Sequence, residues 1–174
     1  MPVPAPASPA ARIAALEAAY AHIAATRMAG LPLLQPGLRV QALGFAPQAD
    51  APQWLLGVLI TPWFMNLLRL PLGPQAEPLA LGERGARTLG QGARRLALDF
   101  IGAHEPALGG FEACSLFSPL HGFADQAAVV ATAEAVLAQL RAATAAAAGA
   151  STGVPAAGPV PSRRGFLFGR GAAA

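Results

Sequence analysis

Short apolar runs broken by prolines dominate the chain between residues 38 and 71, and they restrict the folds that it can adopt. The runs cover Leu38 to Phe45, Leu55 to Thr61 and Leu67 to Leu70, and they are separated by Pro47, Pro52 and Pro62. Each run has the length and composition of a strand, whereas proline cannot donate to a sheet ladder and favours turns. The region therefore predicts antiparallel strands joined by short connections.

Two further strands are predicted after a long interruption. Residues 73–92 are rich in proline, glycine and arginine, and we expect a loop or an irregular crossing there. Beyond it, Leu96, Leu98 and Phe100 alternate with smaller or polar residues. That alternation indicates a strand with one buried and one wet face, and residues 111–117 repeat the pattern.

Helical signals flank this strand region. Ser8 followed by Pro9 is typical of a helix start, and we expect a helix that runs to about Arg27 and is ended by Gly30 and Pro32. Asp125 can cap a second helix that runs to about Ala145. Its apolar side chains fall on one face, and they are Val129, Val130, Ala133, Val136, Leu137 and Leu140.

The last part of the chain has a different composition. Residues 149–161 are Ala, Gly, Pro, Ser, Thr and Val without periodicity, which favours a disordered linker because such a segment cannot bury enough apolar area. We therefore predict one domain over residues 8–148 and a flexible tail over 149–174. The predicted fold class is α+β, with an antiparallel sheet, an N-terminal and a C-terminal helix packed against it, and a disordered C-terminal tail.

Composition excludes several functional classes. All twelve basic residues are arginines, they are mostly scattered, and the net charge is only +3, so we expect no nucleic-acid partner. A single cysteine, Cys114, allows neither an internal disulfide nor a multi-thiolate metal site, which fits a reducing compartment. No secretory signal is visible, and the apolar stretch Trp54 to Met65 is too short to span a bilayer. We expect a soluble, cytoplasmic protein.

The residues that could support catalysis form no recognisable pattern. His22, His104 and His121 lack the spacing of metal ligands, and Cys114 lies in a predicted strand where a small buried thiol is ordinary. We therefore expect no enzyme activity and no cofactor. The alternative is a thiol-dependent enzyme or small-ligand binder in which Cys114 or His121 performs the chemistry.

The segment from Thr61 to Asn66 is the strongest candidate for a binding site. It places three large apolar side chains, Trp63, Phe64 and Met65, beside Pro62 at a predicted turn. These side chains fit either a corner of the core or an exposed surface for an extended peptide. We expect a partner-binding site made by Pro62, Trp63, Phe64, Met65, Asn66, Phe117 and Phe123.

A second candidate lies in the tail. Ser162 to Leu167 reads Ser-Arg-Arg-Gly-Phe-Leu, which matches the core of a twin-arginine export signal, although too few residues follow for it to act as one. The segment is either a solvated basic tail or an imitation of such a signal. In the second case Arg163, Arg164, Phe166 and Leu167 would occupy the groove that binds a cargo signal.

With these motifs in view, the chain resembles the HybE-type family of [NiFe]-hydrogenase assembly chaperones, which includes HupJ and HoxT proteins. The resemblance covers roughly residues 10–141, and it is carried by Arg27–Pro32, Val40–Phe45, Leu56–Leu67, Ala113–Pro119 and Phe123–Asp125. It implies a non-enzymatic factor that binds precursor subunits of the hydrogenase and restrains twin-arginine export of the small subunit. A structural subunit that stays in the mature hydrogenase is a third hypothesis.

Overall fold

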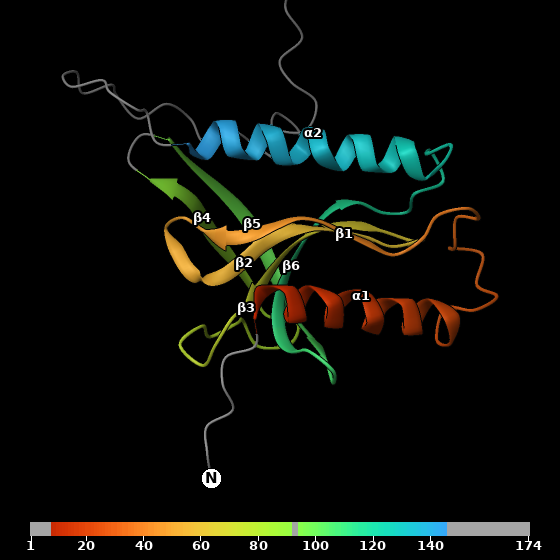
Figure 1. Ribbon diagram of the computed structural model, residues 1–174, viewed down its shortest axis with the longest axis horizontal. Coiled ribbons are helices and arrows are strands. Elements are labelled where there is room, and N and C mark those ends of the chain that lie inside the picture. Colours follow the sequence, from red (N-terminus) through yellow and green to blue (C-terminus); the bar gives the residue numbers. More distant parts are fainter. Residues whose placement is uncertain (1–7, 92–93, 146–174) are drawn as a thin grey trace, which may run out of the picture.

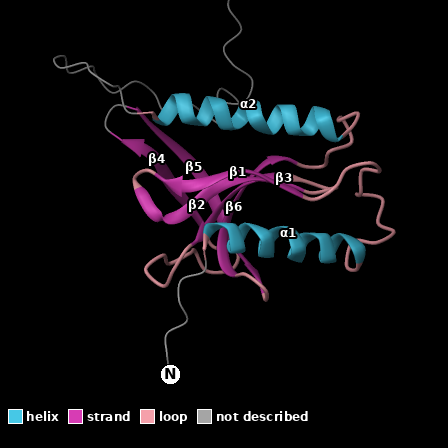
Figure 2. Cartoon of the chain, viewed as in Figure 1, coloured by secondary structure: helices cyan, strands magenta, loops and turns pink. Residues whose placement is uncertain are grey.

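The protein is a six-stranded antiparallel sheet between two helices, as seen in the computed structural model, which describes residues 8–91 and 94–145 (Figure 1). The sheet order is β1-β2-β3-β6-β5-β4. In chain order the elements are α1 (Pro9–Ala25), β1 (Gln41–Gln48), β2 (Ala51–Ile60), β3 (Met65–Pro71), β4 (Arg84–Gln91), β5 (Arg94–Glu105), β6 (Gly109–Phe117) and α2 (Gln126–Thr144). The helices cover opposite sides of the sheet (Figure 2). The predicted fold class is confirmed, while the predicted tail lies outside the described residues.

Both helices begin where their caps predict. The Ser8 Oγ accepts a hydrogen bond from the Ala11 N–H at 3.2 Å, and the Asp125 Oδ1 accepts one from the Ala128 N–H at 2.8 Å. Each cap satisfies an N–H group that has no partner within the helix. Helix α1 ends at Ala25, before the predicted position, and turns lead from there to Gly30, which has a φ of 77°.

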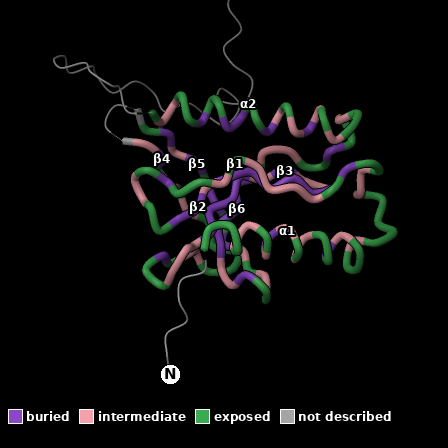
Figure 3. The backbone as a smooth tube through the Cα atoms, viewed as in Figure 1, coloured by how far each residue is buried: buried purple, intermediate pink, exposed green. Residues whose placement is uncertain are grey.

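Side chains of the central strands alternate between two cores, one under each helix. The core on the α2 side contains Val58, Ile60, Leu67, Leu98, Phe100, Val129 and Leu137, among others. The core on the α1 side contains Leu16, Leu55, Leu59, Leu68, Leu70 and Phe111. Burial on both faces explains why the sequences of β2 and β3 are nearly continuous apolar runs. Figure 3 shows the buried residues concentrated in these strands.

Helix α2 has a composition that also suits a membrane. Among the described helices, it alone has the length and hydropathy to cross a bilayer. Its buried side chains, Val129, Ala133, Val136, Leu137 and Leu140, pack on the sheet. The rest of the helix is rich in alanine, so these buried side chains and the alanines together give the high mean hydropathy.

Strand β4 corrects the predicted loop over residues 73–92. Residues 84–91 pair with β5 from Arg84↔Ile101 to Gln91↔Arg94. The glycines and arginines of this segment give no strand pattern in the sequence. In the structure, Leu89 is buried in the α2-side core and Arg87 reaches a buried carboxylate. Long-range pairing thus overrides the local turn signals.

The prolines in the first hairpin also lie differently from the prediction. Pro47 and Pro52 are inside β1 and β2 instead of between strands. Pro47 lies in an edge strand, and Pro52 lies beside a register shift next to Gln48. Proline is tolerated at an edge or an irregularity because no ladder N–H is needed there.

A bulge in β1 brings this strand close to α2. Leu43 pairs with Val58, but Ala46 pairs with Leu56, so β1 carries one extra residue at this point. Gly44 has a φ of 64°, and a Cβ there would lie 2.5 Å from the Leu137 Cδ1. Glycine therefore serves both the left-handed backbone and the close approach of the helix.

A buried charge network crosses the α2 side of the sheet. Glu112 in β6 is fully buried and accepts hydrogen bonds from Arg69 in β3 and from Arg87 in β4. The Leu79 N–H also donates to the Glu112 Oε1 at 3.1 Å. One carboxylate thus connects two strands and the loop between β3 and β4.

Arg69 extends this network toward β1. Its guanidinium carbon lies 4.1 Å from the centre of the Trp54 ring, and its Nε donates to the Gln48 Oε1 at 3.1 Å. Stacking and hydrogen bonding together offset part of the cost of removing the charge from water.

The same contacts set the pKa of Glu112. Burial alone would raise the pKa, but the hydrogen bond from Arg87, the charge of Arg69 and the Leu79 N–H outweigh it, so the pKa is lower than that of an ordinary glutamate. A carboxyl group whose pKa is lower in the folded state stabilises the fold at pH values above its pKa in the unfolded chain, which is near 4.3 for glutamate. This stabilisation is lost as the pH falls through the folded pKa.

We predict that Glu112→Gln lowers the free energy of unfolding by about 3–5 kcal/mol, because it leaves two arginines without their buried counter-charge. Urea denaturation at neutral pH measures the loss. Glu105→Gln is the matched control, since Glu105 pairs with Arg27, whose side chain is 60% exposed, and it should cost about 0–1 kcal/mol. Equal losses for the two variants would contradict a special role for the network.

Candidate partner-binding surface

The turn between β2 and β3 is organised by the Thr61 side chain. Its Oγ1 accepts hydrogen bonds from the Trp63 N–H at 3.3 Å and from the Phe64 N–H at 3.0 Å. The Thr61 N–H also donates to the Phe64 carbonyl at 2.9 Å. The threonine hydroxyl satisfies two backbone N–H groups of the turn, and Pro62 restricts the backbone dihedral angles. The turn therefore holds Trp63 and Phe64 in fixed positions.

These two aromatic residues pack on α1 through Tyr20. The ring centroids are 5.5 Å apart for Trp63 and Phe64, 5.8 Å for Tyr20 and Phe64, and 6.4 Å for Tyr20 and Trp63. All three side chains are half-buried. Trp63 and Phe64 therefore combine the two predicted possibilities, because part of each side chain packs on the protein and part faces solvent.

Phe117 and Phe123 form a second pair at the same end of the sheet. Their rings meet edge to face with centroids 5.5 Å apart, and both are half-buried against the α2-side core. Phe64 packs against the α1-side core instead. The predicted aromatic residues thus lie on both sides of the sheet.

Gln35 joins the two sides. Its N–H donates to the Pro62 carbonyl at 2.8 Å, and its Nε2 donates to the Phe123 carbonyl at 3.1 Å. The His121 Nδ1 lies 3.5 Å from the Gln35 Oε1. One loop between α1 and β1 therefore holds the β2–β3 turn and the segment after β6 together.

The same loop exposes two leucines shortly before Gln35, with Leu31 43% and Leu33 48% exposed. We call the combined surface the aromatic end, and define it by Leu31, Leu33, Trp63, Phe64, Phe117 and Phe123. Sequence reasoning missed Leu31, Leu33 and the supporting roles of Tyr20 and Gln35. The apolar Leu-Pro-Leu sequence directly after Gly30 was the available signal.

The other predicted residues of this segment lie beneath the surface. Pro62 and Met65 are buried. Asn66 is half-buried, and its Oδ1 is enclosed without a hydrogen-bond donor among the described residues. These side chains support the aromatic end, and their direct contact with a partner stays a prediction. Arg163, Arg164, Phe166 and Leu167 lie outside the described residues.

The geometry gives little support to the alternative hypothesis of thiol chemistry. Cys114 is 1% exposed within the α2-side core, and His121 is exposed on the aromatic end. Residues 8–91 and 94–145 contain no group of three His, Cys, Asp or Glu side chains that could hold a metal ion. The cavity described below is lined by neither Cys114 nor His121.

Burial and charge also change the pKa of Tyr20 at the base of the aromatic end. Desolvation by burial and the charge of Glu105 raise the pKa, the charge of Arg27 lowers it, and the net result is a pKa of about 12. The neutral phenol is therefore favoured in the fold. Because the folded pKa is raised, this contribution to stability is present below pH 10 and is lost as the pH rises through 12.

The arrangement defines an α+β protein with a supported aromatic surface at one end of a sheet that is covered on both faces. Comparison with known proteins gives the family. Residues 11–169 match the family described as [NiFe]-hydrogenase assembly, chaperone, HybE. The chain belongs to this family of hydrogenase assembly chaperones.

Individual relatives agree with this assignment. The chain is 47% identical to Protein HoxT of Cupriavidus necator over 169 residues, covering 91% of this chain and 89% of the relative. It is 40% identical to the hydrogenase expression/formation protein HoxT of Azotobacter vinelandii, covering 88% of each. The solution structure of HybE from Escherichia coli has a TM-score of 0.55 at 22% identity, covering 93% of this chain and 91% of the other, and shares the fold.

We predict that a thiol reagent modifies Cys114 only when the protein unfolds. Because the side chain is 1% exposed, alkylation at neutral pH should be slower than in urea by roughly a thousandfold or more, given a typical stability above about 5 kcal/mol. Mass spectrometry measures the rate on the single cysteine. Rapid modification of the folded protein would instead support an accessible, activated thiol.

We also predict that Tyr20, the one tyrosine in the chain, ionises near pH 12 in the folded protein and near 10 in the urea-unfolded chain. Ultraviolet absorbance of the phenolate follows both titrations. Glu105→Gln should lower the folded pKa, because it removes a negative charge that disfavours the phenolate. Identical titrations of folded and unfolded wild-type protein would contradict the burial of this ring.

Proposed function

We propose that the protein binds precursor subunits of a [NiFe]-hydrogenase in the cytoplasm and holds back twin-arginine export of the small subunit until assembly is complete. It acts by binding and catalyses no reaction of its own. The observation that supports the proposal is the aromatic end, where exposed apolar side chains lie on a rigid support. The names of the relatives, which refer to hydrogenase expression and formation, agree with it.

The chemistry of this surface suits an extended apolar segment of another polypeptide. Trp63 and Phe64 are held by the Thr61 turn and by Tyr20, so little side-chain entropy is lost when a partner covers them. Leu31 and Leu33 add exposed apolar area on the loop that Gln35 connects to the turn. Clustered aromatic anchors with an apolar surround are the usual composition of a binding hot spot.

The decisive experiment compares capture of hydrogenase precursor subunits by tagged wild-type protein and by the double variant Leu31→Ser, Leu33→Ser. Both leucines are exposed, so the change should leave the core intact. Adding Trp63→Ala to this double variant removes an anchor worth about 2 kcal/mol. We expect the triple variant to bind the subunits roughly thirtyfold more weakly than the wild-type protein does. Affinity measured with purified subunits gives the ratio.

Leu81→Ser is the matched control, because Leu81 is 78% exposed in the β3–β4 loop and lies outside the aromatic end. It should bind as wild type does. Thermal unfolding of each variant shows whether it is folded. Unchanged capture by folded aromatic-end variants would contradict this site, and stoichiometric recovery of the protein with the mature enzyme would favour a retained structural subunit.

A further inference from the structure

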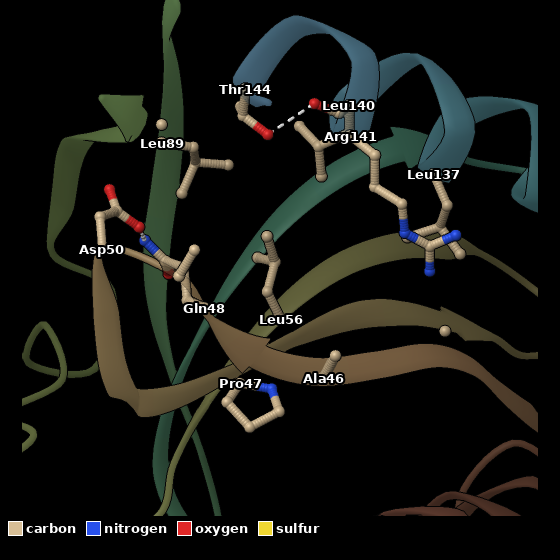
Figure 4. A pocket seen from close by; sticks show the side chains of 13 residues that line it. Ala46, Pro47, Gln48, Asp50, Leu56, Leu89, Leu137, Leu140, Arg141 and Thr144 are labelled. Carbon is tan, nitrogen blue, oxygen red and sulfur yellow. Dashed lines mark hydrogen bonds between the residues drawn. The ribbon is translucent and has the colours of Figure 1, made fainter. Parts of the chain in front are cut away.

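A cavity lies between the sheet and α2 (Figure 4). Its volume is about 480 Å³, and it adjoins the β1–β2 hairpin, at the end of the sheet opposite the aromatic end. It lies between β1, β4 and the last turns of α2. Its walls are mainly apolar, formed by Leu56, Leu89, Leu137, Leu140, Pro47 and Ala46. Its volume is within the range of about 300–1,000 Å³ that is usual for ligand sites.

The polar side chains of the cavity are satisfied among themselves or lie at its rim. The Asp50 Oδ1 accepts a hydrogen bond from the Gln48 Nε2 at 2.8 Å, and the Thr144 Oγ1 donates to the Leu140 carbonyl at 2.8 Å. Arg141 extends from α2 toward β1 (Figure 4). The apolar walls therefore remain the main surface that a ligand would cover.

The C-terminal end of α2 lies at this cavity, and the rest of the chain follows from there. Thr144 lines it, and Ala145 is the last described residue. Residues 146–174 follow, and their aromatic and leucine residues are consecutive in the sequence, Phe166, Leu167 and Phe168. About twenty residues rich in Ala, Gly, Pro and Ser precede that group, and a flexible chain of that length spans about 25 Å on average. The group can thus reach the cavity without strain.

Charge at the rim sets an orientation for this occupant. The charged residues after Ala145 are Arg163, Arg164 and Arg170, all basic, and they flank the apolar group on both sides. Asp50 provides a carboxylate at the rim, and the carboxyl end of α2 carries partial negative charge. Arg141 has the opposite sign, so the tail arginines should lie toward Asp50. The family match extends to residue 169 and includes this segment.

We propose that Phe166, Leu167 and Phe168 dock into this cavity as an intramolecular ligand, with the neighbouring arginines at its rim. The short linker gives the segment an effective concentration of order millimolar. A foreign segment of similar arginine and phenylalanine chemistry would have to displace it. The cavity adjoins the β1–β2 hairpin, whereas the aromatic end adjoins the β2–β3 turn, so the docked tail leaves the aromatic end open.

Paramagnetic relaxation in the full-length chain tests this docking without any partner, and so independently of the proposed function. A spin label on Gly169→Cys should strongly reduce the amide signals of Gly44, Ala46 and Gly90, which line the cavity, and leave those of Leu31 and Trp63 unchanged. Wild-type protein treated with the same reagent is the control, because Cys114 is 1% exposed.

Two further changes in the labelled chain make the result specific. Ala46→Trp should fill the cavity and restore the signals, whereas Ala138→Trp, at an exposed position of α2 outside the cavity, should not. Replacing Phe166, Leu167 and Phe168 together by serine should also restore them. Signal loss at the aromatic end, equal loss over the whole domain, or loss that survives the serine replacements would each overturn the proposal.

Discussion

Burial of the sheet on both faces is the constraint on which the rest of the structure depends. With α1 on one side and α2 on the other, the central strands β2, β3 and β6 have no free face. Apart from its edge strands, the sheet is then open only at its two ends. The aromatic end and the cavity occur at these ends, and the covered faces hold them in fixed positions.

The Glu112 network follows from the same constraint. A carboxylate placed between a sheet and its covering elements loses its hydration, so it persists only with several donors. Arg69, Arg87 and the Leu79 N–H supply them from separate elements. Because Arg69 also reaches Gln48, the network ends at the cavity rim, where Gln48 in turn donates to Asp50. Core electrostatics thereby fix the polar edge of the cavity.

Local patterns in the sequence predicted the helix caps at Ser8 and Asp125 and the turn at Pro62, because each depends on neighbouring residues. Strand β4 was not predictable, since its glycines favour turns, and it is stabilised by pairing with β5, burial of Leu89 and the contact of Arg87 with Glu112. The aromatic end was predicted in part. Trp63, Phe64, Phe117 and Phe123 stood out by type, but Gln35 and Tyr20 join them through contacts that are distant in sequence. The cavity was not predicted, because its lining residues, Gly44 of the bulge among them, come together from four elements that are distant in sequence.

The partial burial of the aromatic residues bears on how such a protein works. Tyr20 and the α1-side core already cover part of Trp63 and Phe64, so under the proposed function a partner would cover only the remaining area. Fixed anchors of limited area favour binding that is specific yet reversible, because little entropy is lost and little area is buried. An assembly factor needs that combination, since it must recognise an unfinished subunit and then leave it. The same geometry would serve a permanent subunit poorly, because obligate interfaces bury larger and more apolar areas.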